Sequence, residues 1–261
     1  MSGRDQLFDT PRTPQDFAFD EPVVGVFPDM IRRSVPGYEL VIEMSAMLAA
    51  RHVPPGGLCF DLGSSLGATS LALQTAIRTA HVCIVGVDSA PAMIARARAN
   101  QAAAAQSTAA ARRDDATAPA IEFRCADLLD VDCTGAHAVL MNFTLQFVPP
   151  AKRLALLTRL RTQLAPGGVL LYAEKLAAST HAEPGRSTDD AVLPWDEDAH
   201  VDFKRANGYS ELAIAQKRTA LEQVMQPDTI EQHQARLFAA GFGWQHCWFR
   251  CLNWAAFAAR P

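Results

Sequence analysis

Short apolar runs alternate with helical segments over residues 58–176, and this alternation limits the possible folds more than any other feature of the chain. Each run has the length and the branched, apolar composition of a buried strand. Helical segments at 68–80, 89–106 and 149–168 connect most of the runs. Because strand–helix–strand units join parallel strands through right-handed crossovers, the pattern predicts an α/β fold around an open parallel sheet. The five runs are LCFDLG, HVCIVGVD, IEFRCADLLD, HAVLMNFTLQFV and VLLYAEKL.

The segments outside this core are predicted in less detail. Residues 1–30 contain several prolines and are expected to be irregular. A turn at Pro36-Gly37 precedes a helix whose expected apolar face is Leu40, Ile42, Met44, Met47 and Leu48. Polar connections are expected at 107–119 and 177–198. The remaining expected elements are a helical region at 200–225, a helix at 229–242 and strand material at 244–259.

Charge and composition exclude several classes of protein. The formal net charge is −4, whereas a protein that binds RNA or DNA over a broad face usually has a basic excess. The N-terminus does not resemble a signal peptide, and no apolar run is long enough to predict a membrane span. The cysteines are scattered, and the closest His/Cys group, at 246–251, lacks a spaced fourth zinc ligand. We therefore expect a cytoplasmic protein that acts on small molecules, with no direct nucleic acid, no membrane and no metal.

Acidic and amide residues stand at the ends of successive predicted strands. Gly63 begins a loop after the first strand, and Asp88, Asp127 and Asn142 follow the next three in order. Ligands of open parallel sheets bind outside the carboxyl ends of the strands. A carboxylate after the second strand can accept hydrogen bonds from both ribose hydroxyls, and one after the third can accept from the amine of adenine. The series therefore predicts a site shaped for adenosine.

The loop GSSLG after the first strand is open to two other interpretations. It matches G-x-S-x-G, the turn that presents a nucleophilic serine in hydrolases, here Ser65. A hydrolase also needs a late histidine, and neither His233 nor His246 stands in an obvious strand-end loop. A dinucleotide dehydrogenase would need G-x-G-x-x-G, which this loop lacks. A loop without that pyrophosphate cradle suits S-adenosylmethionine, which has no phosphates.

Several longer stretches resemble one family, the carboxy-S-adenosyl-L-methionine synthases of tRNA wobble-uridine oxyacetylation. The stretches are FPDMIRRSVPGY, DLGSSLGA, SAPAMI, NFTLQF and DFKRANGYSELAIAQKR, and the likeness extends over nearly the whole chain. It implies a Rossmann-like class I methyltransferase fold, with a mostly parallel central sheet and helices on both faces. The expected organisation is a single domain over 1–261: residues 1–50 cover the site, 51–176 form the cofactor-binding core, and 177–261 supply substrate and dimer helices and closing strands.

The resemblance also implies a reaction. S-adenosyl-L-methionine and prephenate would give carboxy-S-adenosyl-L-methionine, phenylpyruvate and water. The methyl group would take up the carbon dioxide that prephenate loses, and the hydroxide that leaves prephenate is the candidate base. A homodimer is implied as well. The alternatives are an ordinary S-adenosylmethionine-dependent methyltransferase on a small acceptor and a cofactor-binding protein without activity.

The resemblance also implies individual site residues, each at a position that matches a family motif. Arg205 is the candidate catalytic residue, because a planar guanidinium suits the new carboxylate better than an ammonium does. Secondary candidates for holding prephenate are Arg32, Arg33 and Lys204. Two residues depart from the family pattern, because Ser64 and Ser89 replace its usual cysteine and asparagine. The expected cofactor-binding residues are Tyr38, Gly63, Ser64, Ser65, Asp88, Ser89, Asp127, Leu128, Asn142 and Arg205.

Four further residues near these motifs receive separate expectations. Asp61 is expected to hold the loop after the first strand. Phe143 and Phe147 are expected in the core. Tyr209 stands in the same motif as Arg205, and the sequence leaves open whether it serves the substrate or the fold.

Overall fold

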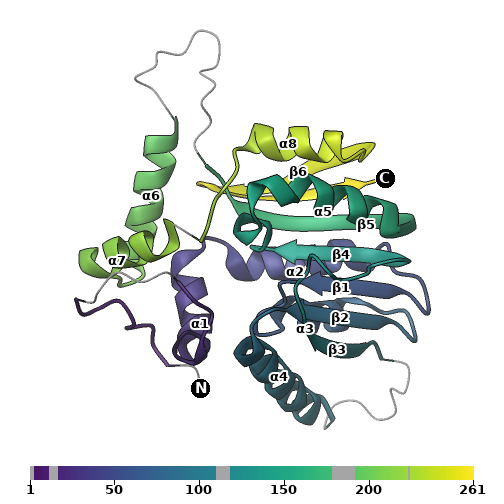
Figure 1. The fold of residues 1–261 in the computed structure, drawn as a ribbon. Helices are drawn as coiled ribbons and strands as arrows, with labels where there is room; N and C mark the ends of the chain where they lie inside the picture. Colours follow the sequence, from purple (N-terminus) through teal and green to yellow (C-terminus); the bar gives the residue numbers. More distant parts are fainter. Residues whose placement is uncertain (1–2, 12–16, 110–117, 178–191, 223) are drawn as a thin grey trace.

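A computed structural model of the chain describes residues 3–11, 17–109, 118–177, 192–222 and 224–261 (Figure 1). Within these residues, seven strands form one sheet in the order β3-β2-β1-β4-β5-β7-β6. Strands β1 to β5 run parallel, and β7 runs antiparallel to both of its neighbours. The predicted mostly parallel sheet is therefore confirmed. The strands are β1 Leu58–Leu62, β2 Cys83–Asp88, β3 Ala120–Cys125, β4 Ala136–Asn142, β5 Leu164–Lys175, β6 Trp244–Cys251 and β7 Trp254–Arg260.

Helices cover both faces of the sheet because its central strands are apolar on both faces. In β4, Val139 and Met141 belong to one apolar cluster, and Ala138 and Leu140 belong to another. Helices α5 and α8 contribute to the first cluster, and α2 and α3 contribute to the second. Helix α4 packs beside β2 and β3 (Figure 1). Their bounds are α2 Tyr38–Ala50, α3 Ala68–Ala76, α4 Pro91–Ala109, α5 Pro150–Gln163 and α8 Ile230–Ala239.

A third group of helices lies beyond the carboxyl ends of the strands, at the left of Figure 1. It consists of α1 Glu21–Ser34, α6 Val192–Ala206 and α7 Glu211–Glu222. An apolar cluster that includes Val24, Met30, Ala213 and Ile214 holds α1 against α7. This group faces the strand ends at which the sequence places the site.

Helix α1 contradicts the expectation of irregular structure for residues 21–30, whereas residues 3–11 and 17–20 contain neither helix nor strand, as expected. Asp20 caps the helix by accepting a hydrogen bond from the N–H of Val23 at 3.2 Å. Pro22 lies in the first turn, where its missing N–H costs little. The prolines therefore did not mark a break: one of them starts the helix, and Pro28 lies inside it.

The boundaries of other predicted elements also shift. The run at 137–148 leaves the sheet at Asn142 and continues as a short 3-10 helix, η1 Leu145–Phe147. The helical region at 200–225 is two helices, and α6 already begins at Val192, inside the expected connection at 177–198. Residues 110–117 and 178–191 of the two expected connections lie outside the described residues. No helix in the described part of the chain combines the length and the hydropathy that crossing a membrane requires.

Candidate functional site

A cavity of about 580 Å³ opens at the carboxyl ends of β1, β2 and β4. The strand order reverses between β1 and β4, so the cavity lies at the switch point of the sheet, where open α/β sheets bind ligands. Residues of α1, α2, α6 and α7 complete its wall. The structure brings together at this cavity all of the predicted cofactor residues except Arg205, namely Tyr38, Gly63, Ser64, Ser65, Asp88, Ser89, Asp127, Leu128 and Asn142.

The loop after β1 depends on left-handed backbone at Gly63, Ser65 and Gly67, with φ of 79°, 48° and 83°. The N–H groups of Gly63 and Ser64 both donate to the carbonyl oxygen of Val87 at 2.8 Å, which fastens the loop to the end of β2. A Cβ atom at Gly63 would lie 2.2 Å from Oγ1 of Thr144. The loop therefore passes too close to the segment after β4 for any residue but glycine.

Asp88 connects this loop to the start of α4. Its Oδ2 accepts from the N–H of Ser65 and its Oδ1 accepts from the N–H of Ala90, both at 2.9 Å. Burial raises the pKa of Asp88 above its usual range, and these two backbone donors oppose the rise. Each carboxylate oxygen keeps a further lone pair that can accept from a ligand hydroxyl.

Ser65 lacks the surroundings of a nucleophile. Its hydroxyl lies 3.5 Å from Sδ of Met93, and His200, which lines the same cavity, bonds to the carbonyl oxygen of Ser34 and not to Ser65. His233 packs in the core, with its ring centroid 5.0 Å from that of Phe257, and burial lowers its pKa to about 4. The G-x-S-x-G match is therefore a cavity loop and not a hydrolase elbow.

Besides the indole Nε1 of Trp254, two buried polar atoms of cavity residues at the strand ends have no partner among the described residues. The Nδ2 of Asn142 donates to Oγ of Ser45 at 3.0 Å and lies 3.3 Å from Oγ1 of Thr69, whereas its Oδ1 is unpaired. The hydroxyl of Ser64 is unpaired as well. Buried polar atoms are nearly always hydrogen-bonded, so these two fit contacts to a bound molecule.

Asp61 was expected to hold the loop after β1 through backbone N–H groups, but its hydrogen-bond partner lies in α3. Its Oδ2 accepts from the hydroxyl of Ser70 at 2.7 Å, and burial raises the pKa of Asp61 to about 7. It does not line the cavity. Its contact is to the first turn of α3, so it fixes the helix that follows the loop.

Aromatic side chains form a large part of the cavity wall. The ring of Tyr38 lies 5.6 Å from that of Phe143, which lies 5.5 Å from that of Trp254. The ring of Phe147 lies 5.5 Å from that of Phe19, in the N-terminal segment. Phe143 and Phe147 line the cavity, so the expectation that they belong to the core alone was wrong.

Arg205 lies apart from the cavity. It is exposed on α6, where its guanidinium bonds to Glu211 at 2.5 Å and to Asp202 at 2.7 Å. These two carboxylates raise its pKa. The structure therefore does not bring Arg205 to the site of its own chain.

The three secondary candidates for holding prephenate lie in different surroundings. Arg32 is exposed and does not line the cavity, whereas Arg33 is buried and donates to the carbonyl oxygen of Asn207 at 2.7 Å. Tyr209 donates its hydroxyl to the carboxylate of Asp5, and this contact assigns it to the fold. Lys204 does line the cavity, together with four cationic or imidazole side chains that the sequence analysis missed: Lys175, His200, Lys217 and Arg218.

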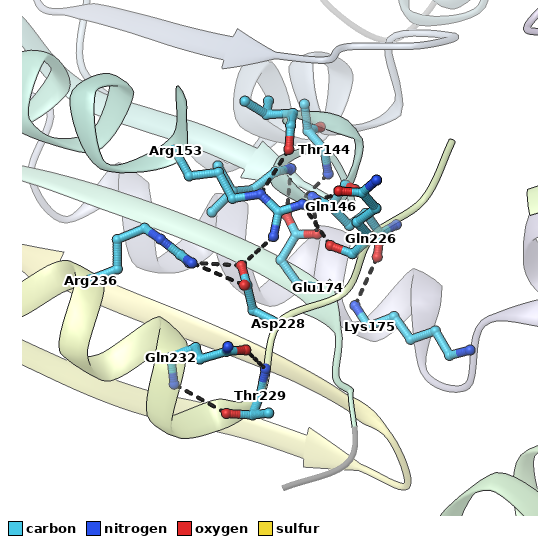
Figure 2. A network of polar contacts seen from close by, with 12 residues as sticks. Thr144, Gln146, Arg153, Glu174, Lys175, Gln226, Asp228, Thr229, Gln232 and Arg236 are labelled. Atoms are coloured by element: carbon cyan, nitrogen blue, oxygen red, sulfur yellow. Dashed lines mark hydrogen bonds and ion pairs between the residues drawn. The ribbon is translucent and has the colours of Figure 1, made fainter. Parts of the chain in front are cut away.

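A buried polar network fixes the segment after β4 (Figure 2). Glu174 accepts from the N–H groups of Thr144, Leu145 and Gln146 at 3.1, 2.7 and 3.0 Å. Arg153 donates to the carboxylate of Asp228 and to the carbonyl oxygens of Val148, Gln146 and Gln226. The network thus joins two parts of the cavity wall, the 143–149 segment and the 225–227 segment.

The His/Cys group at 246–251 lies along β6, away from the cavity. Within the described ranges, no three His, Cys, Asp or Glu side chains gather in a way that could hold a metal ion.

Comparisons with known proteins agree with this geometry. A family model described as a methyltransferase domain matches residues 60–170. The carboxy-S-adenosyl-L-methionine synthase of Geobacter metallireducens is 48% identical over 244 residues, which cover 94% of this chain and 92% of the relative. The synthase of the same name from Pseudomonas entomophila is 46% identical over 258 residues, 98% of both chains.

Solved structures share the fold at much lower identity. Human N-acetylserotonin methyltransferase in complex with S-adenosylmethionine matches with a TM-score of 0.52 and 18% identity, over 94% of this chain and 60% of that one. The S-adenosylmethionine-dependent methyltransferase SibL matches with a TM-score of 0.58 and 16% identity, over 96% and 64%. These structures confirm the class I methyltransferase fold.

Proposed function

Because this chain belongs to the carboxy-S-adenosyl-L-methionine synthase family, we propose that it uses prephenate as its second substrate. The chain is an enzyme of the transferase class, with S-adenosyl-L-methionine as substrate and carboxy-S-adenosyl-L-methionine as product. The observation that supports the proposal most directly is the convergence of the predicted cofactor residues around one cavity at the switch point.

We assign roles in cofactor binding to residues at the strand ends. Asp88 accepts from the ribose hydroxyls, and Asp127 accepts from the adenine amine, each with a lone pair that its backbone contacts leave free. Asn142 Oδ1 and the Ser64 hydroxyl pair with polar groups of the bound molecule. Tyr38 and Phe143 supply an apolar surface beside it.

The overall reaction balances without a protein base. Prephenate loses carbon dioxide and its ring hydroxyl and becomes phenylpyruvate. The departing hydroxide takes a proton from the activated methyl group, which gives water, and the methyl carbon forms the new bond to carbon dioxide. When bound, S-adenosylmethionine supplies an acidic methyl group next to a sulfonium. The chain's contribution is to hold both molecules in contact and to keep bulk water out of an aromatic cavity.

Mass spectrometry of the reaction tests this function. Purified protein is incubated with S-adenosylmethionine and prephenate, and the expected products are carboxy-S-adenosylmethionine and phenylpyruvate in equal amounts. A protein that binds S-adenosylmethionine but forms neither product would instead be an ordinary methyltransferase or a binding protein.

Arg205 remains our candidate for the new carboxylate, and we propose that it reaches the cavity of a second copy in a homodimer. Its exposure on α6, next to the cavity residue Lys204, supports this role in trans. The test mixes two inactive variants, Arg205→Ala and Asp88→Ala. In a dimer with shared sites, the mixture regains activity because one site has both residues intact. If Arg205 acts in its own chain, the mixture stays inactive.

We further propose that the protein acts in the cytoplasm and does not contact tRNA itself, although its product serves tRNA modification. The net charge of −4 supports the absence of direct contact. Filter binding with bulk tRNA at low salt is expected to give no retention above that of an acidic control protein. Tight, salt-sensitive retention would contradict this.

A further inference from the structure

One end of the cavity is lined by basic side chains from three elements. Lys175 stands at the carboxyl end of β5, Lys204 lies on α6, and Lys217 and Arg218 lie on α7. These four cations outnumber the carboxylate of Glu222, which α7 also contributes to the cavity wall, so they attract ligands of negative charge. This end therefore differs from the strand ends of β1, β2 and β3, where the site residues are acidic or uncharged.

Two of the four cations already have partners. The Nζ of Lys217 donates to the hydroxyl of Ser34 at 2.9 Å and lies 3.8 Å from Oδ2 of Asp5. Arg218 pairs with Glu197 at 3.4 Å. The ammonium groups of Lys175 and Lys204 have neither a hydrogen bond nor an ion pair within 4 Å with any described residue, and the nearest opposing influence is the longer-range attraction of Glu197 on Lys175.

The two unpaired ammonium groups are held in place at an energetic cost. Both are half-buried, and burial lowers the pKa of Lys175 and brings that of Lys204 to about 8. Repulsion from Lys175 lowers the pKa of Lys204 further. An unpaired, partly desolvated charge is unfavourable, and an anion placed between the two ammonium groups would relieve both the desolvation and the repulsion.

The backbone of Lys175 is fixed by the polar network of Figure 2. Its N–H donates to Oε1 of Gln146 at 3.0 Å, and the N–H of Gln146 donates to the buried Glu174. Figure 2 shows the side chain of Lys175 extending away from the other labelled residues of this network. The same residue lines the cavity. The ammonium group thus projects from a rigid strand end.

His200 does not add a third charge. Its Nε2–H donates to the carbonyl oxygen of Ser34 at 2.7 Å, and burial lowers its pKa to about 3. At neutral pH this imidazole is a fixed neutral group beside the two lysines. The charge available to a ligand is therefore that of Lys175 and Lys204.

We propose that Lys175 and Lys204 form a carboxylate subsite that binds the second substrate, an inference that rests on the proposed function. A carboxylate could also come from the methionyl end of S-adenosylmethionine. That end carries its own ammonium, which neutralises its carboxylate. Prephenate has two carboxylates and no internal cation, so two unpaired ammonium groups match it better.

The experiment compares Lys175→Gln, Lys204→Gln and the double variant with Lys152→Gln, an exposed lysine on α5 that is not at the cavity. Thermal melting checks that each variant is folded. The KM for prephenate is expected to rise roughly tenfold or more in each single variant, because a buried charge pair is lost. The Kd for S-adenosylmethionine, from calorimetry, is expected to stay within about twofold of the wild-type value. Lys204→Arg, which keeps the charge, is expected to recover part of the loss.

Each other outcome has a defined meaning. Weaker S-adenosylmethionine binding with an unchanged KM for prephenate would assign the lysines to the cofactor and overturn the subsite. Unchanged values for both molecules would overturn it as well. If the wild-type protein forms no carboxylated product, the proposed function fails. Calorimetry of prephenate with the protein–S-adenosylhomocysteine complex then tests the subsite by itself: wild-type binding lost in the lysine variants supports it, and binding that is absent or unchanged contradicts it.

Discussion

Gly63 carries two separate constraints, a left-handed backbone and a close approach to Thr144. Gly56 has a similar φ of 72° but open space where a Cβ would stand. Gly63→Ala is therefore expected to lose clearly more stability than Gly56→Ala, which should cost about 1–2 kcal/mol from backbone strain alone. Gly63→Ala should also abolish S-adenosylmethionine binding, because the loop must move away from the cavity. Urea denaturation and calorimetry on both variants measure this, and equal losses would contradict the steric explanation.

Ser65 was the residue that separated a hydrolase from a cofactor site. Its N–H bonds to Asp88, whereas its hydroxyl meets only the thioether of Met93 among the described residues. Ser65→Ala keeps the N–H, so it is expected to weaken S-adenosylmethionine binding by only a fewfold, and kcat should change little. Steady-state kinetics test this, and complete loss of activity in a folded variant would restore a direct role for the hydroxyl.

The pKa of Lys204, about 8, gives a prediction for pH dependence. Below this value the ammonium is charged and attracts a carboxylate; as pH rises through it, the charge is lost from the free enzyme. The KM for prephenate should therefore increase from pH 7 to pH 9, and Lys204→Arg should flatten the increase. A KM that stays constant in the wild-type protein would contradict the charged role. The groups that face Lys204 or its neighbours are Lys175, Glu197, His200, Lys217 and Arg218.

At the scale of the elements, Glu174 is the residue on which η1 depends. Glu174→Gln leaves one amide N–H₂ facing backbone N–H donors, so it should cost about 1–3 kcal/mol of stability and weaken S-adenosylmethionine binding. The matched control is Glu122→Gln, on the exposed edge strand β3, which should change stability by less than about 0.5 kcal/mol. Denaturation curves of the two variants measure their free energies of unfolding. Equal free energies for Glu174→Gln and Glu122→Gln would contradict a supporting role for the network.

The elements also reveal what a single sequence could predict. The position of α2 was right, but its predicted apolar face was wrong at Leu40 and Met47, which are 51% and 47% exposed. The small residues Ala46 and Ala49 are buried instead, because α2 packs closely against α3 and the sheet. Residue hydrophobicity predicted that the large side chains of α2 would be buried. The narrow space between the two helices instead accommodates the small ones.

At the scale of the whole molecule, local sequence patterns were sufficient to predict the sheet and the end of the cavity that binds the cofactor. Buried parallel strands are apolar runs, and their carboxyl ends meet at one edge, so Gly63, Asp88 and Asn142 could be placed together from spacing alone. The cationic end could not be predicted in this way. Lys175 and Lys217 come from a strand end and from a helix, and only the tertiary packing of α6 and α7 beyond the sheet brings them together.

Asp5 gives a test of that packing. It is 1% exposed, it accepts from the hydroxyl of Tyr209, and its carboxylate lies near Lys217. Asp5→Ala leaves a buried hydroxyl and a buried ammonium without this partner, so it should cost about 3–5 kcal/mol. Asp9→Ala, an exposed change in the same segment, should cost little. Chemical denaturation of both variants measures the difference, and equal costs would show that the buried contact contributes nothing.

The contact of Asp5 with Tyr209 spans 204 positions of the chain, and that of Ser34 with Lys217 of α7 spans 183. These separations bear on how the protein is synthesised. The sheet core from β1 to β5 can form while the ribosome is still adding α6 and α7, because its strands pair with near neighbours. The N-terminal segment already contacts α1 and Phe147, but the buried side chain of Asp5 meets Tyr209 and Lys217 only after α7 has emerged. The contacts of Asp5 and Ser34 are thus among the last to form, and the cavity wall is complete only after α7 and Trp254 have been added.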